Sequence, residues 1–381
     1  MDLSLNRQQS HLVNLVQQLA REEIRPYAQS HDFTRNEGFD WYLVRQLGKH
    51  NLVCPTIPRE YGGLGLDIFT TALIVEEIAC ACPGLAAVID TNLHAVQPLL
   101  LAGSEEQKTR FLPLLTGREA HLAAFALTEP SGGSDLNAMH TFAEKNGQQF
   151  IIDGKKDYIL NTPEASFISL FAMTNLRKKK ASMRYFVIPR DTPGVKIGKT
   201  RAMQVLDYAR LGELIFDNAV LDSDFVIKVK EPLSGYLLMN QTFDIGRALV
   251  GATSVGIARA AYELAYEFAD QRIQFGRKIK DHQSVSYALV EMATKIEMAR
   301  LLTWKACWLI DRGDDYTVAS AMAKLSASVI AQEVTRMAAD ILAARAFEKG
   351  SYIGQLLRDA MALSTIEGTN NIQRNIIVSL L

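Results

Sequence analysis

The 381-residue sequence predicts an α+β fold in which an N-terminal helical domain, a small middle β domain and a C-terminal four-helix bundle follow one another. Two changes of pattern along the chain support this prediction. Apolar residues recur every three or four positions before about residue 120 and again after about residue 229, as in amphipathic helices. Between these regions, short apolar or alternating runs are bounded by proline and glycine, which is typical of strands. We therefore expect domains over residues 1–120, 121–228 and 229–381.

The composition argues against several classes of function. Hydrophobic residues make up 48% of the chain and charged residues 22%, an ordinary globular balance, and the formal net charge is -1. This charge gives no reason to expect binding to nucleic acid or to an anionic membrane. The four cysteines lack metal-ligand spacing, so we predict no metal site and reduced thiols in a cytoplasmic protein. Residues 1–6 lack the pattern of a secretory signal, and we expect no membrane span.

The N-terminal region is predicted to be helical with one interruption. Leu12, Leu15 and Leu19 recur at helical spacing, and Pro26 marks the point where that helix should stop or kink. Residues 55–67 contain two prolines and three glycines and are not helix interior. Helices should then cover residues 68–81 and 86–102, with a capping box at residues 104–107 opening the next helix.

The middle region should contain short strands and the C-terminal region long helices. Residues 150–156 predict a strand that enters a hairpin turn at Asp153-Gly154. Further strands are expected at residues 167–172, 184–188 and 213–216. Helical periodicity covers residues 250–268, 285–310 and 316–345, with a stop at Gly313. Short connections between long helices predict an antiparallel bundle.

A carboxylate near the C-terminus is the first candidate for chemistry. Glu367 stands between the apolar Ile366 and Gly368, which has no side chain. A carboxylate in a dry pocket is a useful proton acceptor near neutral pH, and a glycine beside it allows another molecule to approach the backbone. Taken alone, this stretch fits a solvated residue at a helix end better than a catalytic one.

Three other segments carry groups that suit a ligand. Residues 125–135 offer hydroxyls and glycine amides, residues 272–276 with Gln283 offer a guanidinium and an aromatic ring, and residues 243–247 place Arg247 at the head of a helix. Each also has an ordinary structural explanation: a Ser/Gly loop, a turn between helices, and an ion pair at a helix start.

Five segments in sequence order resemble motifs of the acyl-CoA dehydrogenase family, and the resemblance covers nearly the whole chain. They are residues 58–65, 103–108, 128–135, 272–276 and 367–369. The resemblance implies a tightly bound FAD between the β domain and the C-terminal bundle. It also implies a homotetramer built as a dimer of dimers.

The resemblance assigns roles to individual residues. Glu367 is the implied catalytic base. The residues implied to bind FAD are Phe125, Leu127, Thr128, Gly133, Ser134, Tyr158, Leu160, Thr369 and Asn371. Those implied to reach the FAD of a neighbouring subunit are Arg272, Gln274, Phe275, Gln283, Asp340 and Ala344. Those implied to bind substrate are Ser134, Asp244, Arg247 and Gly368.

The implied reaction is α,β-dehydrogenation of an acyl thioester carried by CoA or by a carrier protein. Glu367 removes the α-proton while the β-hydrogen leaves as hydride to flavin N5. The Glu367 backbone N–H and a flavin ribityl hydroxyl stabilise the thioester oxygen. Some family members carry the base near Arg247, but this chain has Gly246 there. An electron-transfer flavoprotein or oxygen reoxidises the flavin. A non-catalytic flavin-binding scaffold is the alternative from another class.

The chain departs from the family pattern at several positions. It has Ile366 before the base, Tyr158 and Leu160 beside the expected flavin, and Ala343 and Ala344 where the family has paired glycines. Residues 203–208 lack the usual Gly-x-Arg-x-Ser. These departures suggest a biosynthetic member whose thioester sits on a carrier protein in natural-product assembly.

Overall fold

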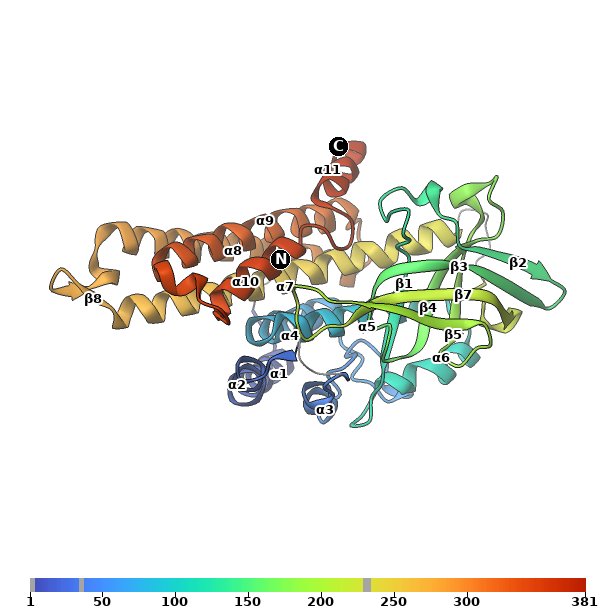
Figure 1. The fold of residues 1–381 in the computed structure, drawn as a ribbon, viewed down its shortest axis with the longest axis horizontal. Coiled ribbons are helices and arrows are strands. Elements are labelled where there is room, and N and C mark those ends of the chain that lie inside the picture. Colours follow the sequence, from blue (N-terminus) through green and yellow to red (C-terminus); the bar gives the residue numbers. More distant parts are fainter. Residues whose placement is uncertain (1–3, 34–37, 229–233) are drawn as a thin grey trace.

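The structure, a computed structural model, describes residues 4–33, 38–228 and 234–381. Figure 1 shows a helical half and a β half joined by helices that run between them. This architecture confirms the predicted α+β class. Two expectations fall on residues outside the described ranges: the absence of a signal pattern at residues 1–3, and the domain boundary at residue 229.

The N-terminal helices end before the sheet begins. They are α1 (Arg7–Leu19), a π-helix (Ala20–Ile24), α2 (Arg25–Ser30), α3 (Tyr42–Gly48), α4 (Ile68–Ala81), α5 (Pro83–Ala102) and α6 (Glu105–Phe111). The predicted capping box is confirmed, since the Ser104 and Gln107 side chains each bind the other's backbone N–H. The helix does not stop at Pro26, as one form of the prediction expected. A bond from the Arg25 N–H to the Ala20 carbonyl widens the turn before the proline, and helical structure continues to Ser30.

Helix α5 lies in the centre of the molecule. It packs against α4, α7 and the first strand, and most of its residues are buried. Although no membrane span was expected from the sequence, α5 is long and apolar enough for one by length and composition alone, and 83% of its apolar window is buried inside the protein. The apolar character of α5 is explained by its position in the core.

The seven-stranded sheet has the order β1-β4-β2-β3-β7-β6, with β5 paired to β4. The strands are β1 (Leu122–Ala126), β2 (Phe142–Asn146), β3 (Gln149–Leu160), β4 (Ala165–Met173), β5 (Met183–Pro189), β6 (Val195–Arg201) and β7 (Leu211–Asp222). Strands β1 and β4 are parallel, whereas β3 pairs with both β2 and β7 in antiparallel register.

The predicted hairpin turn at Asp153-Gly154 is wrong. Strand β3 runs straight through both residues, and the turn lies between Asn146 and Gln149, which pair directly. Gly154 instead occupies an irregularity in the pairing of β3 with β7, at a φ of +147°. A Cβ there would lie 2.6 Å from the Thr141 Cα, so the glycine serves a close backbone approach.

The C-terminal helices form the predicted bundle. They are α7 (Ser234–Gln271), α8 (Gln283–Arg312), α9 (Thr317–Leu342), α10 (Tyr352–Ala362) and α11 (Asn370–Leu380). Helix α9 packs against each of the others. Between α7 and α8, the two-residue strands β8 (Ile273–Gln274) and β9 (Arg277–Lys278) form the far tip of the helical half (Figure 1). The predicted stop at Gly313 is confirmed by its left-handed conformation at the end of α8.

Candidate active site

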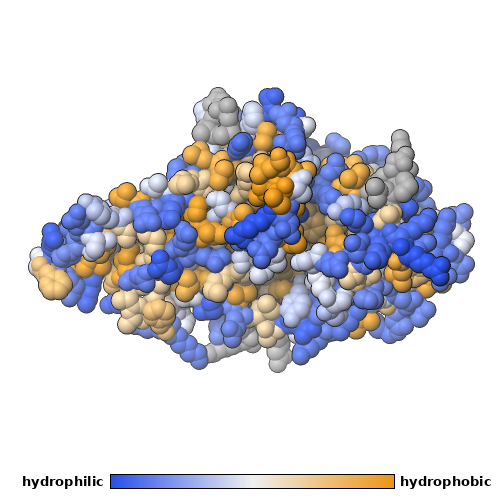
Figure 2. Space-filling view, turned by 90° about the horizontal axis from the view of Figure 1, so that it is seen from above, coloured by the Kyte–Doolittle hydropathy of each residue, from blue (hydrophilic) through white to orange (hydrophobic). Residues whose placement is uncertain are grey.

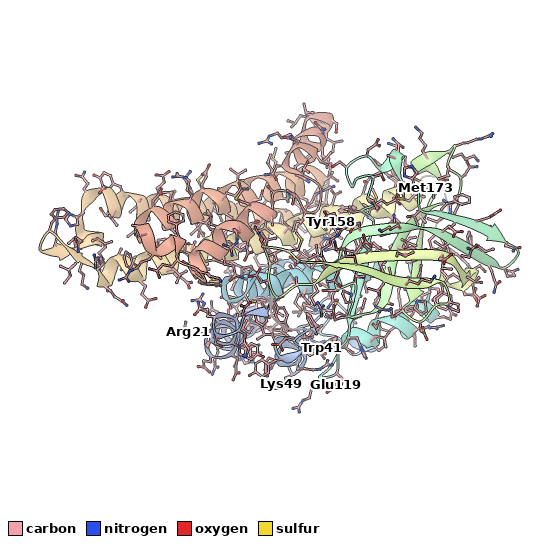
Figure 3. The ribbon with its side chains drawn as sticks, in the orientation of Figure 1. Arg21, Trp41, Lys49, Glu119, Tyr158 and Met173 are labelled. Atoms are coloured by element: carbon pink, nitrogen blue, oxygen red, sulfur yellow. The ribbon has the colours of Figure 1, made fainter. Side chains whose placement is uncertain are left out.

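A cavity of about 430 Å³ lies where the sheet meets the C-terminal helices. Tyr158, labelled in Figure 3, stands at this junction. The cavity is bounded by the end of β3, the loop after β1, helix α5 and the segment between α10 and α11. Ten of the residues that the resemblance implied line it: Phe125, Leu127, Thr128, Gly133, Ser134, Tyr158, Leu160, Glu367, Gly368 and Thr369.

A buried ion pair fixes the loop after β1. The Lys156 ammonium is wholly buried and donates to the Glu129 carboxylate (2.9 Å) and to the Leu127 carbonyl (2.8 Å). Burial outweighs the Glu129 charge and lowers the pKa of Lys156 to about 8. The same carboxylate accepts from the backbone N–H groups of His140 and Thr141. These contacts tie residues 127–129 to β3, and the sequence analysis did not single out either member of the pair.

The hydroxyls of Thr128 and Ser134 suit a polar ligand. Within the described part of the chain, neither side-chain hydroxyl has a hydrogen-bond partner, and both residues line the cavity. Gly133 keeps the loop tight, because a Cβ there would lie 3.1 Å from the Thr128 Oγ1. An apolar wall with a few free hydroxyls fits a flat aromatic ring system that has polar edges, as the FAD isoalloxazine has.

Glu367 lines the same cavity from the C-terminal helices. It sits between α10 and α11 at a φ of +52°, followed by Gly368 at +84°. The Glu367 side chain is only 16% exposed, so water has limited access to its carboxylate. The expectation that Glu367 is a solvated residue at a helix end is therefore not met.

A second buried lysine holds the segment that carries Glu367. The Lys324 ammonium, on α9, donates to the carbonyls of Ser364 (3.2 Å) and Gly368 (2.9 Å) and to the Asn370 Oδ1 (2.9 Å). Gln373 adds bonds to the Glu367 and Gly368 carbonyls. Burial lowers the pKa of Lys324 to about 8. The backbone around the carboxylate is thus held from two helices, which keeps its left-handed conformation in place.

His94 on α5 is a cavity residue that the sequence analysis missed. Its Nε2 lies 3.2 Å from the Glu367 Oε2, and its Nδ1 lies 2.6 Å from the Asp90 carbonyl oxygen. The available signal was a run of polar residues, from Asp90 to Asn92 and His94, within an otherwise apolar helix. Its meaning depended on knowing that α5 passes beside Glu367.

Asp244 and Arg247 do not line the cavity. They form a buried ion pair with each other, and the Asp244 carboxylate also accepts from the Thr317 hydroxyl (2.8 Å). Both lie inside α7 rather than at its head, since α7 begins at Ser234. Their predicted contact with substrate stays a prediction, and an anionic substrate group would have to compete with Asp244 for the guanidinium.

The other implied cofactor residues lie away from this cavity. Arg272, Gln274 and Phe275 belong to the β8–β9 tip, at the far end of the helical half from the sheet (Figure 1). Phe275 is 95% exposed. The remaining members that do not line the cavity are Gln283, Asp340, Ala344 and Asn371. One chain therefore forms only part of the site that the resemblance implies.

The segment with an altered family motif also reaches the cavity. Met203, Val205 and Leu206 line it, and Leu206 adopts a φ of +54°. The Leu206 N–H donates to the buried Asp359 carboxylate (2.6 Å). The altered motif was visible in the sequence, but its place in the cavity wall was not predicted.

Comparisons with known proteins agree along the whole chain. Models of the acyl-CoA dehydrogenase N-terminal, middle and C-terminal domains match residues 6–119, 124–219 and 234–381. An acyl-CoA dehydrogenase of Bacillus subtilis (strain 168) is 35% identical over 377 residues, covering 98% of each chain. Butyryl-CoA dehydrogenase from Megasphaera elsdenii superposes with a TM-score of 0.94 at 30% identity, covering 100% of this chain and 99% of that one. The prolyl acyl carrier protein oxidase AnaB gives 0.91 at 29% identity over 99% of each chain.

The fold and the cavity define a flavin-dependent oxidoreductase that acts on CH–CH groups. Its cofactor is FAD. The chain belongs to the acyl-CoA dehydrogenase family, as its sequence motifs predicted.

Proposed function

We propose that this enzyme desaturates the α,β bond of an acyl thioester, with Glu367 as the base that takes the α-proton. The observation that carries this proposal is the position of Glu367. Its side chain is shielded from water and lines a cavity that Thr128 and Ser134 also line. A base acts only where it reaches the proton that it removes. The cavity beside Glu367 provides the space in which the α-carbon of a substrate can lie.

Bound FAD supplies the acceptor for the β-hydride. The residues that would hold it are those on the sheet side of the cavity, including Thr128, Ser134 and Tyr158. The chain's own residues then position the acyl group and manage its proton. In the described residues, the Glu367 N–H donates to no protein acceptor, which leaves it available to the thioester oxygen as charge develops there.

The substitution Glu367→Gln tests the proposal. The amide keeps the size of the side chain but accepts no proton, so the variant should bind FAD normally and lose flavin reduction by about 10²–10⁴-fold. Anaerobic bleaching of the flavin by a panel of acyl thioesters measures this loss. Glu119→Gln is the matched control, because that side chain is 88% exposed and far from the cavity lining. Undiminished flavin reduction in Glu367→Gln would remove Glu367 from the role.

The carrier of the thioester is decided by the same panel. Similarity to butyryl-CoA dehydrogenase supports CoA, whereas similarity to AnaB supports a carrier protein and oxygen as acceptor. We favour a carrier-bound substrate in biosynthesis because residues 203–208 depart from the family motif. Equal turnover of free acyl-CoA would contradict this choice. Peroxide formed per turnover in air distinguishes oxygen from an electron-transfer flavoprotein. A non-catalytic scaffold would show no bleaching with any thioester.

The same proposal includes a homotetramer, a dimer of dimers. Several large apolar side chains are exposed along α8 and α11, namely Tyr287, Val290, Met298, Val378 and Leu380. Figure 2 shows hydrophobic residues interspersed with hydrophilic ones over the helical half on the face that it views. Exposed apolar areas of this kind are typical of subunit interfaces. Light scattering after gel filtration measures the assembly.

We further propose a cytoplasmic enzyme that needs neither nucleic acid nor membrane. Cys54, Cys80, Cys82 and Cys307 are all buried and unpaired, which suits a reducing compartment.

A further inference from the structure

His94 offers Glu367 a partner that the reaction described above does not require. The Nδ1 of His94 faces a carbonyl oxygen, that of Asp90, at 2.6 Å. A carbonyl only accepts, so Nδ1 carries a proton. The Nε2 then either donates as part of an imidazolium or presents a lone pair. It lies 3.2 Å from the Glu367 Oε2, within ion-pair distance, and both atoms are buried and make no well-aligned hydrogen bond in the described residues. Two lone pairs facing each other there would repel, so one proton belongs to this contact.

The surroundings favour the charged form of His94. Burial is the largest single effect and opposes the charge, but the attraction of Glu367 and the contacts of Asp90, on the same helix, together outweigh it and raise the pKa of His94 to about 9. On α7 the charged residues next to Gly246 are Asp244 and Arg247, which form an ion pair with each other. On α9, Lys324 is turned to the backbone carbonyls of the Glu367 segment.

Gly246 leaves the room that the imidazole fills. A Cβ at Gly246 would lie 1.6 Å from the His94 Nε2, so any larger residue on α7 would displace the ring. The same glycine is the position at which some family members carry their base. In this chain, α5 supplies a side chain to the volume that α7 leaves empty.

We propose that His94 is a positioning residue for Glu367: its protonated Nε2 forms an ion pair with the carboxylate and holds it at the cavity wall, and Gly246 is required for that contact. The ring stabilises the ionised carboxylate before substrate enters. The role of Glu367 as base rests on the proposed function, but the ion pair does not.

The first test needs no substrate. A histidine with a folded pKa of about 9 and an unfolded pKa near 6.5 gives stability that is fully present below about pH 6.5 and is lost as the pH rises through 9. Thermal unfolding of the FAD-bound enzyme is followed from pH 6 to 10 in wild type, His94→Gln, Glu367→Gln and the double variant. The two substitutions should be non-additive at pH 6 and additive at pH 10.

Two matched controls separate the ion pair from packing. His121→Gln makes the same change at an exposed histidine and should keep the wild-type pH dependence. Gly246→Ala should abolish the His94 contribution, whereas Gly38→Ala should not, because nothing lies within 4 Å of a Cβ at Gly38. Additive effects of His94→Gln and Glu367→Gln at pH 6 would overturn the proposal. So would an unchanged pH dependence in Gly246→Ala.

The second test measures positioning. With the thioester that bleaches the wild-type flavin fastest, His94→Gln and Gly246→Ala should slow flavin reduction by up to about a hundredfold, since a misplaced base loses this much. We expect the wild-type rate to fall near pH 9, where His94 loses its proton, and the pH profiles of both variants should lack this fall. Wild-type profiles in both variants would contradict a positioning role. If no thioester reduces the wild-type flavin, the proposed function fails, and the thermal cycle still decides on the ion pair.

Discussion

Among the single residues, Asp359 shows how burial without a charged partner changes the energetics of a carboxylate. Its carboxylate is fully buried, one oxygen accepts from the Leu206 N–H, and the other has no partner in the described residues. Burial raises the pKa of Asp359 to about 7. The charged form is therefore costly, because no ion pair with this carboxylate is found within the described ranges.

Asp359→Asn should stabilise the enzyme in alkaline solution. An amide oxygen still accepts from the Leu206 N–H but carries no charge. The native carboxyl keeps its proton up to about pH 7, while an unfolded aspartate loses it near 3.9, so its contribution to stability disappears as the pH rises through 7. The variant should melt several degrees higher than wild type at pH 8 and differ little at pH 4. Calorimetry at both values checks this, and a lower melting temperature at pH 8 would contradict it.

Among single residues, those that stand in a recognisable sequence motif could be predicted from the sequence. Those whose role depends on contacts with residues far away in the chain could not. Glu367 and Ser134 stand in recognisable motifs, and both reach the cavity. Lys156, Lys324 and His94 occur in unremarkable segments. Their importance arises from partners 27, 44 and 273 positions away along the chain, which no local pattern reveals.

Among the elements, β3 shows that a dipeptide typical of hairpin turns can also lie inside a strand. Asp153-Gly154 has the composition of a hairpin turn, but the segment also continues the pairing of β3 with β7. The pairing of a long strand outweighed local turn preference. Pro26 is similar: the π-helical turn before it removes the need for the helix to end. Helix type and position were predictable from periodicity, whereas these irregularities depend on neighbouring elements.

Gly154→Ala tests the close approach of β3 to the segment before β2. The added Cβ would meet the Thr141 Cα at 2.6 Å, and backbone atoms do not move aside easily, so we expect a loss of about 1–3 kcal/mol in unfolding free energy. Gly147→Ala is the control, because Gly147 also has a positive φ, of +60°, but a Cβ there would meet nothing within 4 Å. Urea unfolding measures both. Equal losses would mean that backbone conformation, not packing, requires Gly154.

For the whole molecule, the order helical–β–helical places the flavin site at a boundary. Apolar cores form within the sheet and within the C-terminal bundle, and a third joins the N-terminal helices to both. The cavity lies where these layers meet, so its walls are supplied by α5, β3 and the segment after α10. The order of elements was visible in the sequence. The juxtaposition of α5 with Glu367 was not, because it depends on how the layers pack.

Subunit mixing tests whether the β8–β9 tip completes a neighbour's site. One chain carries Glu367→Gln with an intact tip, and the other carries Arg272→Ala and Phe275→Ala with an intact base. Each variant alone should reduce its flavin poorly, the first for lack of a base and the second for lack of FAD. Because the exposed Phe275 lies far from its own cavity, a tip acting between subunits would supply the second chain's site in a mixed assembly.

Co-expressed chains should therefore recover flavin reduction that neither homo-oligomer shows, approaching the activity of one intact site for each mixed pair. The control is co-expression of the tip variant with a chain that carries all three substitutions, which offers no intact tip and should stay inactive. Recovery in the first mixture alone would establish that each site takes residues from two chains. Failure to recover, with mixed assembly confirmed by differently tagged subunits, would assign the tip to a role outside the flavin site.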